Sequence, residues 1–401
     1  MHYKITKVLF ATIYLWNIAA HGQGALPPIS FRDFSDYDGE GSAVYLINRA
    51  ETKIYHSQGR GWVARTSYQF RLRVLNEDGL DYANLEVDLY QGDADVERID
   101  DIKATTYNIN REKGLIDQVT LGKEAIFTKK TSDRWKEVSF TLPQVSVNSV
   151  IDVNYVKVTP FIFNLDDWYF QHDIPVVKSR YDMVIPAFHQ YVFGLNGYLE
   201  VDTLAAEWNK AKLQYGNYTY QNLEAFWEMS DVPAFQEESF MTTREDYISK
   251  LEFQLKAVIT PNREDTYLKS WEEVTEDLKE DFRFKSFYRR KDKFGDLPQV
   301  TGGDLDKAEA LYKQFKSRFK WNKKFGVFPD VTINRFTKDR EGNTSALGLA
   351  MYNLMKQEGL DVQTCALQSL LQWSHQLRLS FPHETDLYGR EARSRRRDLS
   401  T

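Results

Sequence analysis

The first half of the chain alternates apolar and polar residues with a period of two, which is typical of β-strands with one buried face. In the stretch YQFRLRVLNEDGLDYANLEVDLY, every second residue from Tyr68 to Val74 is apolar, and the same alternation runs from Leu85 to Leu89. The turn-forming residues 76–79 lie between the two runs. This pattern predicts a β-hairpin.

Similar strand patterns continue to about residue 260. The stretch IKATTYNINREKGLIDQVTL predicts a second hairpin that turns at Arg111–Gly114. Further strands are predicted in the segments 135–160, 179–198 and 213–229, and Leu251 to Leu255 alternate once more. Many short strands at this spacing predict an antiparallel β-sandwich over residues 23–260.

The period changes from two to 3.6 after the turn at Thr260–Asp265. Ser270 and Glu273 form the pattern of a capping box. The positions that follow predict a helix with one apolar face, made of Trp271, Val274, Leu278 and Phe282. Asp304 is expected to cap a second helix, whose apolar stripe is Leu305, Ala308, Leu311, Tyr312, Phe315 and Phe319.

A third helix is predicted in the segment REGNTSALGLAMYNLMKQEG. Its apolar positions have helical spacing, and Gly359 is the expected stop signal. A glycine followed by small polar residues at a helix start could present a nucleophile, since helix N-termini stabilise negative charge. Thr344 and Ser345 are therefore the candidate catalytic residues. The alternative is that they cap the helix, which is the commoner use of these residue types.

The N-terminus has the pattern of a signal peptide over residues 1–22. Lys4 and Lys7 precede an apolar run from Val8 to Trp16, and small residues follow. The alternative is a buried N-terminal strand. A signal peptide predicts an exported protein of the periplasm or the outer surface, and no later stretch is apolar enough for a transmembrane helix.

Composition narrows the classes of function. The net charge of -6 argues against nucleic acid as a partner, because phosphate binding needs a basic surface. Cys365 is the only cysteine, which excludes an internal disulfide and a multi-cysteine metal site. It is interpreted as a buried structural thiol. No glycine-rich phosphate loop is present, so no cofactor is predicted.

The seven histidines do not form a metal-binding pattern. His172 lies beside Asp166, Asp167 and Asp173, which is compatible with an acidic binding site or with a loop histidine at a sheet rim. The second interpretation is favoured, because one histidine among carboxylates lacks ligand spacing. Exposed aromatic residues could stack on sugars, although packing in the core is their usual role.

Several motifs resemble the secreted bacterial family known as domain of unknown function 3857. They are LPQVSVNSVIDVNY, DWYFQHDIPVVKSRYDMVIP, RVLNEDGLDYANLEV, IKATTYNI and DVPAFQEESFMTTREDYISKLEFQL, which together cover about residues 40–260. Members of this family place a β-rich domain before a transglutaminase-like domain. The resemblance implies a mainly β chain, with a β-sandwich followed by a partial transglutaminase-like (cysteine-protease-like) α+β domain over residues 261–365.

Within that second domain, REGNTSALGLAMYNLMKQEGLDV resembles the helix that carries the nucleophile. Active relatives open this helix with Gly-x-Cys, and here Gly342-Asn-Thr344 places threonine at the cysteine position. A histidine and an aspartate would come from later strands. Thr344 is therefore interpreted as a pseudo-nucleophile that more simply caps the helix, with Ser345 as a weaker candidate.

The resemblance stops after about Val362. The sequence that follows has no clean period and ends in Arg393-Ser-Arg-Arg-Arg397, so residues 366–401 are expected to be an atypical, disordered tail. A frameshift or a truncated reading frame would explain this change. His375 and His383 are accordingly not assigned to the family histidine. A basic tail for anionic lipid or polysaccharide is the alternative interpretation.

Three hypotheses of function remain open. The favoured one is a non-catalytic binding or scaffold protein of the bacterial envelope, with a peptide, an envelope protein or a polysaccharide as its partner. The second is an acyl-transfer or peptidase-like enzyme that uses Thr344 or Ser345 and needs a histidine nearby. The third is a carbohydrate-binding module, which burial of Trp168 and Trp227 would weaken.

Overall fold

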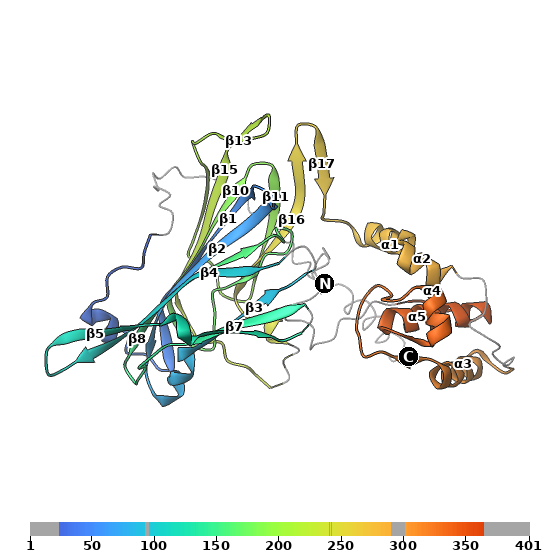
Figure 1. The fold of residues 1–401 in the computed structure, drawn as a ribbon, viewed down its shortest axis with the longest axis horizontal. Helices are drawn as coiled ribbons and strands as arrows, with labels where there is room; N and C mark the ends of the chain where they lie inside the picture. Colours follow the sequence, from blue (N-terminus) through green and yellow to red (C-terminus); the bar gives the residue numbers. More distant parts are fainter. Residues whose placement is uncertain are drawn as a thin grey trace, which may run out of the picture. The chain divides into compact units, whose positions relative to one another are not determined.

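The computed structural model describes residues 24–92, 96–132, 134–239, 241, 243–289 and 301–364. The predicted signal peptide, Cys365, His375, His383 and the predicted tail lie outside the described residues. The chain divides into two compact units, Met1–Asp265 and Thr266–Thr401 (Figure 1). The first unit is built from strands and the second mainly from helices. The prediction of a β-rich part followed by an α+β part is confirmed.

The first unit is organised around an eight-stranded sheet of order β12-β15-β10-β1-β2-β8-β4-β5 (Figure 1). All neighbouring strands are antiparallel except β1 and β10, which run parallel. The strands are β1 (Ala43–Ser57), β2 (Gly61–Val74), β4 (Arg98–Asn110), β5 (Leu115–Thr120), β8 (Val150–Thr159), β10 (Val176–Pro186), β12 (Thr203–Trp208) and β15 (Asn222–Val232).

Smaller sheets complete this unit. One has the order β11-β16-β17 with β9 also paired to β16, another has the order β3-β7-β6, and β13 and β14 form a hairpin. Their bounds are β3 (Asn84–Tyr90), β6 (Ile126–Lys130), β7 (Trp135–Thr141), β9 (Trp168–Tyr169), β11 (His189–Asn196), β13 (Leu213–Tyr215), β14 (Tyr218–Tyr220), β16 (Lys250–Thr260) and β17 (Arg263–Thr266). Short 3-10 helices are Phe31–Phe34, Glu77–Ala83, Lys123–Ala125 and Arg244–Asp246.

The hairpin predicted at Arg111–Gly114 is present, since Asn110 of β4 pairs with Leu115 of β5. The hairpin predicted between residues 68 and 90 is wrong. Both strands exist, but β2 pairs with β1 and β8, whereas β3 pairs with β7. Residues Glu77–Ala83 form a 3-10 helix instead of a tight turn, so the chain leaves the large sheet and enters another.

The alternation along β2 explains how the large sheet acquires one apolar face. Ala64 belongs to a buried cluster that also contains Leu251 and Phe253 of β16. Leu72 belongs to a second buried cluster with Phe140 of β7. Because these β2 positions are separated by an even number of residues, their side chains point to the same side of the sheet. Both smaller sheets therefore pack on that side, as in a sandwich.

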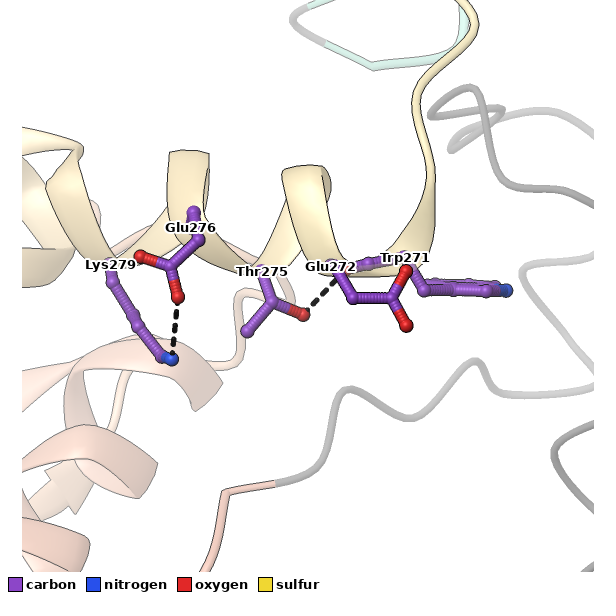
Figure 2. Close-up of a pocket in the computed structure, with 5 residues that line it drawn as sticks. All are labelled: Trp271, Glu272, Thr275, Glu276 and Lys279. Carbon is purple, nitrogen blue, oxygen red and sulfur yellow. Dashed lines mark hydrogen bonds and ion pairs between the residues drawn. The ribbon is translucent and has the colours of Figure 1, made fainter.

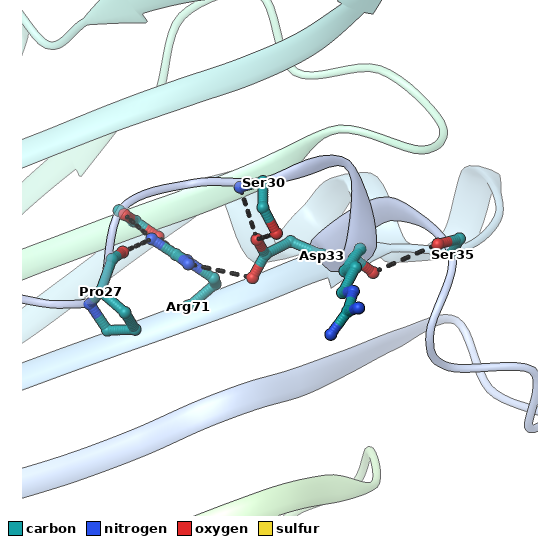
Figure 3. Close-up of polar contacts among 7 residues, drawn as sticks. Pro27, Ser30, Asp33, Ser35 and Arg71 are labelled. Atoms are coloured by element: carbon teal, nitrogen blue, oxygen red, sulfur yellow. Dashed lines mark hydrogen bonds and ion pairs between the residues drawn. The ribbon is translucent and has the colours of Figure 1, made fainter.

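From Arg65 to Arg73 the odd positions of β2 face the other side and are polar. Arg71 is only 1% exposed there. Its guanidinium donates to both Asp152 carboxylate oxygens at 2.7 and 2.8 Å, to Asp33 Oδ1 at 2.9 Å and to the Pro27 carbonyl at 2.7 Å (Figure 3). Burial opposes the charge, but the hydrogen bonds and the attraction of Asp152 and Asp33 outweigh it and raise the Arg71 pKa. Arg71 thus fixes the N-terminal segment to the sheet.

The second unit has the elements α1 (Trp271–Glu280), α2 (Phe282–Tyr288), α3 (Asp304–Arg318), β18 (Lys320–Trp321), α4 (Ile333–Asp339), β19 (Glu341–Gly342) and α5 (Thr344–Gln357). Its core is a cluster around α5 that includes Leu349 and Leu354, with Phe287, Phe315 and Phe336 from α2, α3 and α4. Buried Asn353 donates to the carbonyls of Phe287 and Tyr288, which satisfies acceptors at the end of α2. None of the helices in the described part is long and apolar enough to cross a membrane.

The predicted capping box is present, because Ser270 Oγ accepts from the Glu273 amide and the Glu273 carboxylate accepts from the Ser270 amide. The apolar stripe predicted for this helix holds for Trp271, Val274 and Leu278, which are partly buried on α1, but not for Phe282. The helix ends at Glu280, Asp281 caps a new helix, and Phe282 is 79% exposed. The cap predicted at Asp304 is also displaced, since Gly303 occupies that position and its amide donates to Asp306.

Replacing Arg71 with methionine is expected to lower the free energy of unfolding of the strand-rich unit by about 3 to 5 kcal/mol, because Asp152 and Asp33 lose their shared cation. Urea unfolding followed by circular dichroism measures this loss. Arg65→Met is the matched control on the same strand and face. Arg65 is more exposed and only 3.9 Å from Asp101, so the expected cost is below about 1 kcal/mol. Equal effects of the two variants would refute the anchoring role of Arg71.

Candidate functional site

The N-terminus of α5 is capped by Asn343, not by Thr344 as predicted. Asn343 Oδ1 accepts from the Ala346 amide at 2.9 Å, which satisfies one of the free donors of the first turn. Its Nδ2 donates to the Phe328 carbonyl at 2.8 Å, and its own amide donates to Asp330 Oδ1 at 3.1 Å. Asn343 is only 2% exposed, and its bonds to Phe328 and Asp330 join α5 to the loop between α3 and α4.

Thr344 is the first residue of the helix, and its hydroxyl is used within the fold. Its Oγ1 accepts from the Gly326 amide at 3.2 Å and donates to the Gly326 carbonyl at 3.3 Å. The Thr344 amide donates to the Lys324 carbonyl at 3.2 Å. The side chain therefore clamps the loop against the helix from an exposed position.

Ser345 has a similar role on the next residue. Its Oγ donates to the Val327 carbonyl at 2.6 Å. An acyl-transfer nucleophile must pass its proton to a base such as histidine, whereas a backbone carbonyl accepts a hydrogen bond without removing the proton. The stretches 266–289 and 301–364 of this unit contain no histidine. In the part that the structure describes, both hydroxyls donate to backbone carbonyls of the loop between α3 and α4.

The segment between α3 and α4 is held by a dense set of backbone and side-chain hydrogen bonds. The two-residue strands β18 and β19 pair in parallel, with Lys320 opposite Glu341. Asn322 donates from its amide to the Gly342 carbonyl, donates from Nδ2 to Asp330, and accepts from the Lys324 amide. This arrangement fixes residues 320–330 in front of the N-terminus of α5.

Gly342 has a packing role in this motif. A Cβ at this position would lie 2.8 Å from Ala346 Cβ and 2.9 Å from the Phe336 ring. These distances are too short for a real side chain. The glycine two residues before Thr344 therefore lets the chain approach α4 and α5 closely.

His172 lies outside the helices and strands, in agreement with the favoured interpretation of a loop histidine. Its Nε2 lies 2.9 Å from Asn48 Nδ2, and its ring packs 4.9 Å from that of Tyr45. Burial and the nearby Arg244 charge lower its pKa to about 4. Asp166 and Asp167 instead contact Lys157 and Lys250, at 2.8 and 3.3 Å.

His189 was not singled out by its sequence pattern. It is 4% exposed, it packs against Trp62 and Phe188, and neither ring nitrogen has a hydrogen-bond partner within the described residues. Burial lowers its pKa to about 4. His189 is therefore a neutral core residue.

Other candidate binding features are weak. Trp168 and Trp227 are 5% and 3% exposed, which disfavours the carbohydrate-binding hypothesis that relied on them. Across the described ranges, no group of three or more His, Cys, Asp and Glu side chains could hold a metal ion.

Figure 2 shows a hollow on α1, lined by Trp271, Glu272, Thr275, Glu276 and Lys279. All five lining residues come from this one helix. The Thr275 hydroxyl donates to the Trp271 carbonyl at 2.7 Å, and Lys279 pairs with Glu276 at 3.1 Å. The lining residues thus bond to one another along the helix and do not converge on a ligand.

Asn343→Ala is expected to lower the stability of the helical unit by about 2 kcal/mol, since it removes a cap and leaves buried groups unpaired. Thr344→Ala should cost only about 1 kcal/mol, because its hydrogen bonds are exposed. Thermal unfolding followed by near-ultraviolet circular dichroism compares the two variants. Asn343→Asp keeps the cap acceptor and should give an intermediate loss. A larger loss for Thr344→Ala would contradict the assigned roles.

The strand-rich unit should lose stability as pH falls from about 6.5 to about 4. In this range the unfolded chain binds a proton at His189 and the folded chain does not, which contributes about 3 kcal/mol of destabilisation. Urea midpoints measured across this range test it. His172 in the same unit also has its pKa lowered to about 4, so it contributes a similar dependence in this range. His189→Phe should therefore remove about half of the pH dependence while leaving the midpoint near pH 8 little changed. An unaltered slope in this variant would show that His189 is not responsible.

Comparison with known proteins agrees with the strand-rich fold. Residues 64–235 match the family described as "Domain of Unknown Function with solved-structure structure (DUF3857)". A crystal structure from Parabacteroides distasonis ATCC 8503, described as a "putative protease", aligns with a TM-score of 0.51 and 14% identity. The alignment covers 79% of this chain and 59% of that chain, so this chain spans less than two thirds of that protein.

A second structure gives a much weaker match. It is described as a "putative nutrient binding protein" from Legionella pneumophila subsp. pneumophila str. Philadelphia 1, and it aligns at 9% identity over 79% of this chain and 94% of that chain. Its TM-score of 0.19 is too low to support a conclusion. None of the curated proteins matches the sequence. The family match over residues 64–235 confirms the resemblance seen in the sequence motifs.

Proposed function

We propose that the chain is an exported, non-catalytic binding or scaffold protein of the bacterial envelope. In this proposal a DUF3857 domain precedes a degenerate transglutaminase-like domain. Export is supported by the signal-peptide pattern of residues 1–22. The expected partners are a peptide, an envelope protein or a polysaccharide.

The observation that carries the proposal is the use of both candidate hydroxyls at the start of α5. Thr344 and Ser345 donate to the carbonyls of Gly326 and Val327, and these bonds hold a loop over the helix N-terminus. A nucleophile at this position would instead need a free approach and a base. The likeness to the "putative protease" concerns the fold, because 14% identity transfers no activity to this chain.

An amine-incorporation and peptide-amide hydrolysis assay with the purified chain tests the absence of catalysis. We expect no turnover above that of Thr344→Ala or Ser345→Ala, with circular dichroism as the control for folding. The competing acyl-transfer hypothesis predicts that one of these variants lowers turnover by about a thousandfold or more, the scale of losing a nucleophile. That result would overturn the proposal.

The binding role is tested separately with labelled peptides and cell-wall glycan fragments. The proposal expects a saturable complex from which the ligand is recovered chemically intact. Recovery of cleaved or amine-modified peptide would contradict it, and so would the absence of binding to every member of the panel.

A further inference from the structure

The segment KWNKKFG, residues 320–326, which we call the Trp321 loop, combines charge and exposed aromatic surface. It contains three lysines and no acidic residue. Trp321 and Phe325 are 44% and 57% exposed. This composition contrasts with the net charge of -6 of the whole chain. An exposed aromatic pair beside several cations is unusual for a surface that only faces water.

Hydrogen bonds to other parts of the helical unit hold the backbone of the Trp321 loop in place. The fold therefore keeps the rings of Trp321 and Phe325 exposed. The Lys320 amide donates to the Arg340 carbonyl, and Asn322 bonds to Gly342 and Asp330. The Gly326 amide donates to Thr344 Oγ1. Ordering of this kind removes conformational freedom before a partner binds, which favours binding.

The arrangement of the two rings indicates which partner fits. Their centroids are 4.9 Å apart and their planes meet at 66°, so they do not form the flat platform that stacking on a sugar requires. The indole nitrogen of Trp321 donates to the Lys324 carbonyl at 2.8 Å, so its polar edge is already satisfied within the loop. The exposed remainder of the pair forms an apolar wedge.

The charges around this wedge are predominantly positive. Lys320, Lys323 and Lys324 are exposed, and Lys324 reaches Asp330 only at 3.9 Å. Arg340 is also exposed, next to the acidic neighbour Glu341. Asp330 is occupied by hydrogen bonds from Asn322 and Asn343. The flexible, singly charged lysine side chains suit a surface that carries many phosphates.

We propose that the Trp321 loop docks on an anionic lipid surface. Phe325 and Trp321 enter the headgroup region, where amphipathic and aromatic side chains are favoured, and the lysines contact lipid phosphates. The partner complements the charge of the loop as well as its apolar wedge. This proposal does not depend on the absence of catalysis, because lipid binding is measured without any substrate.

Flotation of the purified full chain tests the proposal, with vesicles of phosphatidylcholine alone and vesicles that also contain phosphatidylglycerol. We expect binding only to the anionic vesicles, with weaker binding at high salt. Lys323→Gln combined with Lys324→Gln should weaken that binding by roughly 30-fold. Phe325→Ala should weaken it while leaving its salt dependence unchanged. The Tyr312→Ala and Lys313→Gln double variant is the matched control, since it removes an exposed aromatic ring and a lysine from α3.

The proposal is wrong if the wild-type chain does not float with anionic vesicles at low salt. It is also wrong if the loop variants bind these vesicles as well as the wild type does, or if the α3 control variant loses as much binding as the loop variants. Binding of a soluble polyglutamate peptide that requires Lys323 and Lys324, without binding to vesicles, would identify an acidic polypeptide as the partner instead. Trp321→Phe serves as a second aromatic variant that retains the ring, and it should preserve flotation.

Discussion

The hydrogen-bonded junction between the N-terminus of α5 and the loop between α3 and α4 is the constraint on which the helical unit depends. Asn343 caps the helix and also binds the Phe328 carbonyl, while Thr344 and Ser345 bind the carbonyls of Gly326 and Val327. These hydrogen bonds therefore hold the loop against the first turn of α5, and they engage the hydroxyls of both candidate nucleophiles.

The strand-rich unit has a comparable polar anchor. Arg71 lies on the polar face of the large sheet, where it joins Asp152 of β8 to the N-terminal segment around Asp33. A buried guanidinium is tolerated because its donors meet two carboxylates and a carbonyl. In both units an ordered polar cluster fixes an irregular segment that apolar packing alone would leave undefined.

The sequence patterns predicted where helices and strands lie more reliably than they predicted which strands pair with each other. Period-two alternation located β2 and β3 correctly, but alternation says nothing about which strands pair, and the pairing proved to be long-range. The capping box at Ser270 succeeded because its two residues bond to each other. At the start of α5, Asn343, Thr344 and Ser345 are all good caps. The choice of Asn343 follows from its second bond to Phe328, which no local pattern reveals.

The sequence also could not predict which individual aromatic and histidine side chains are buried and which are exposed. Trp168 and Trp321 are the same residue type, yet one is buried in the sandwich and the other is 44% exposed on a loop. Their difference depends on which sheets and helices cover them. The resemblance of the strand-rich part to the DUF3857 family was visible in the motifs, and it holds over residues 64–235.

Labelling of the native chain with a fluorophosphonate probe, followed by peptide mass spectrometry, tests the central claim most directly. The probe forms a covalent adduct with serine or threonine hydroxyls that a base has activated. If Thr344 and Ser345 are structural donors, neither residue will carry an adduct in the folded protein. An adduct on either hydroxyl that is lost when the protein is denatured before labelling would contradict this account.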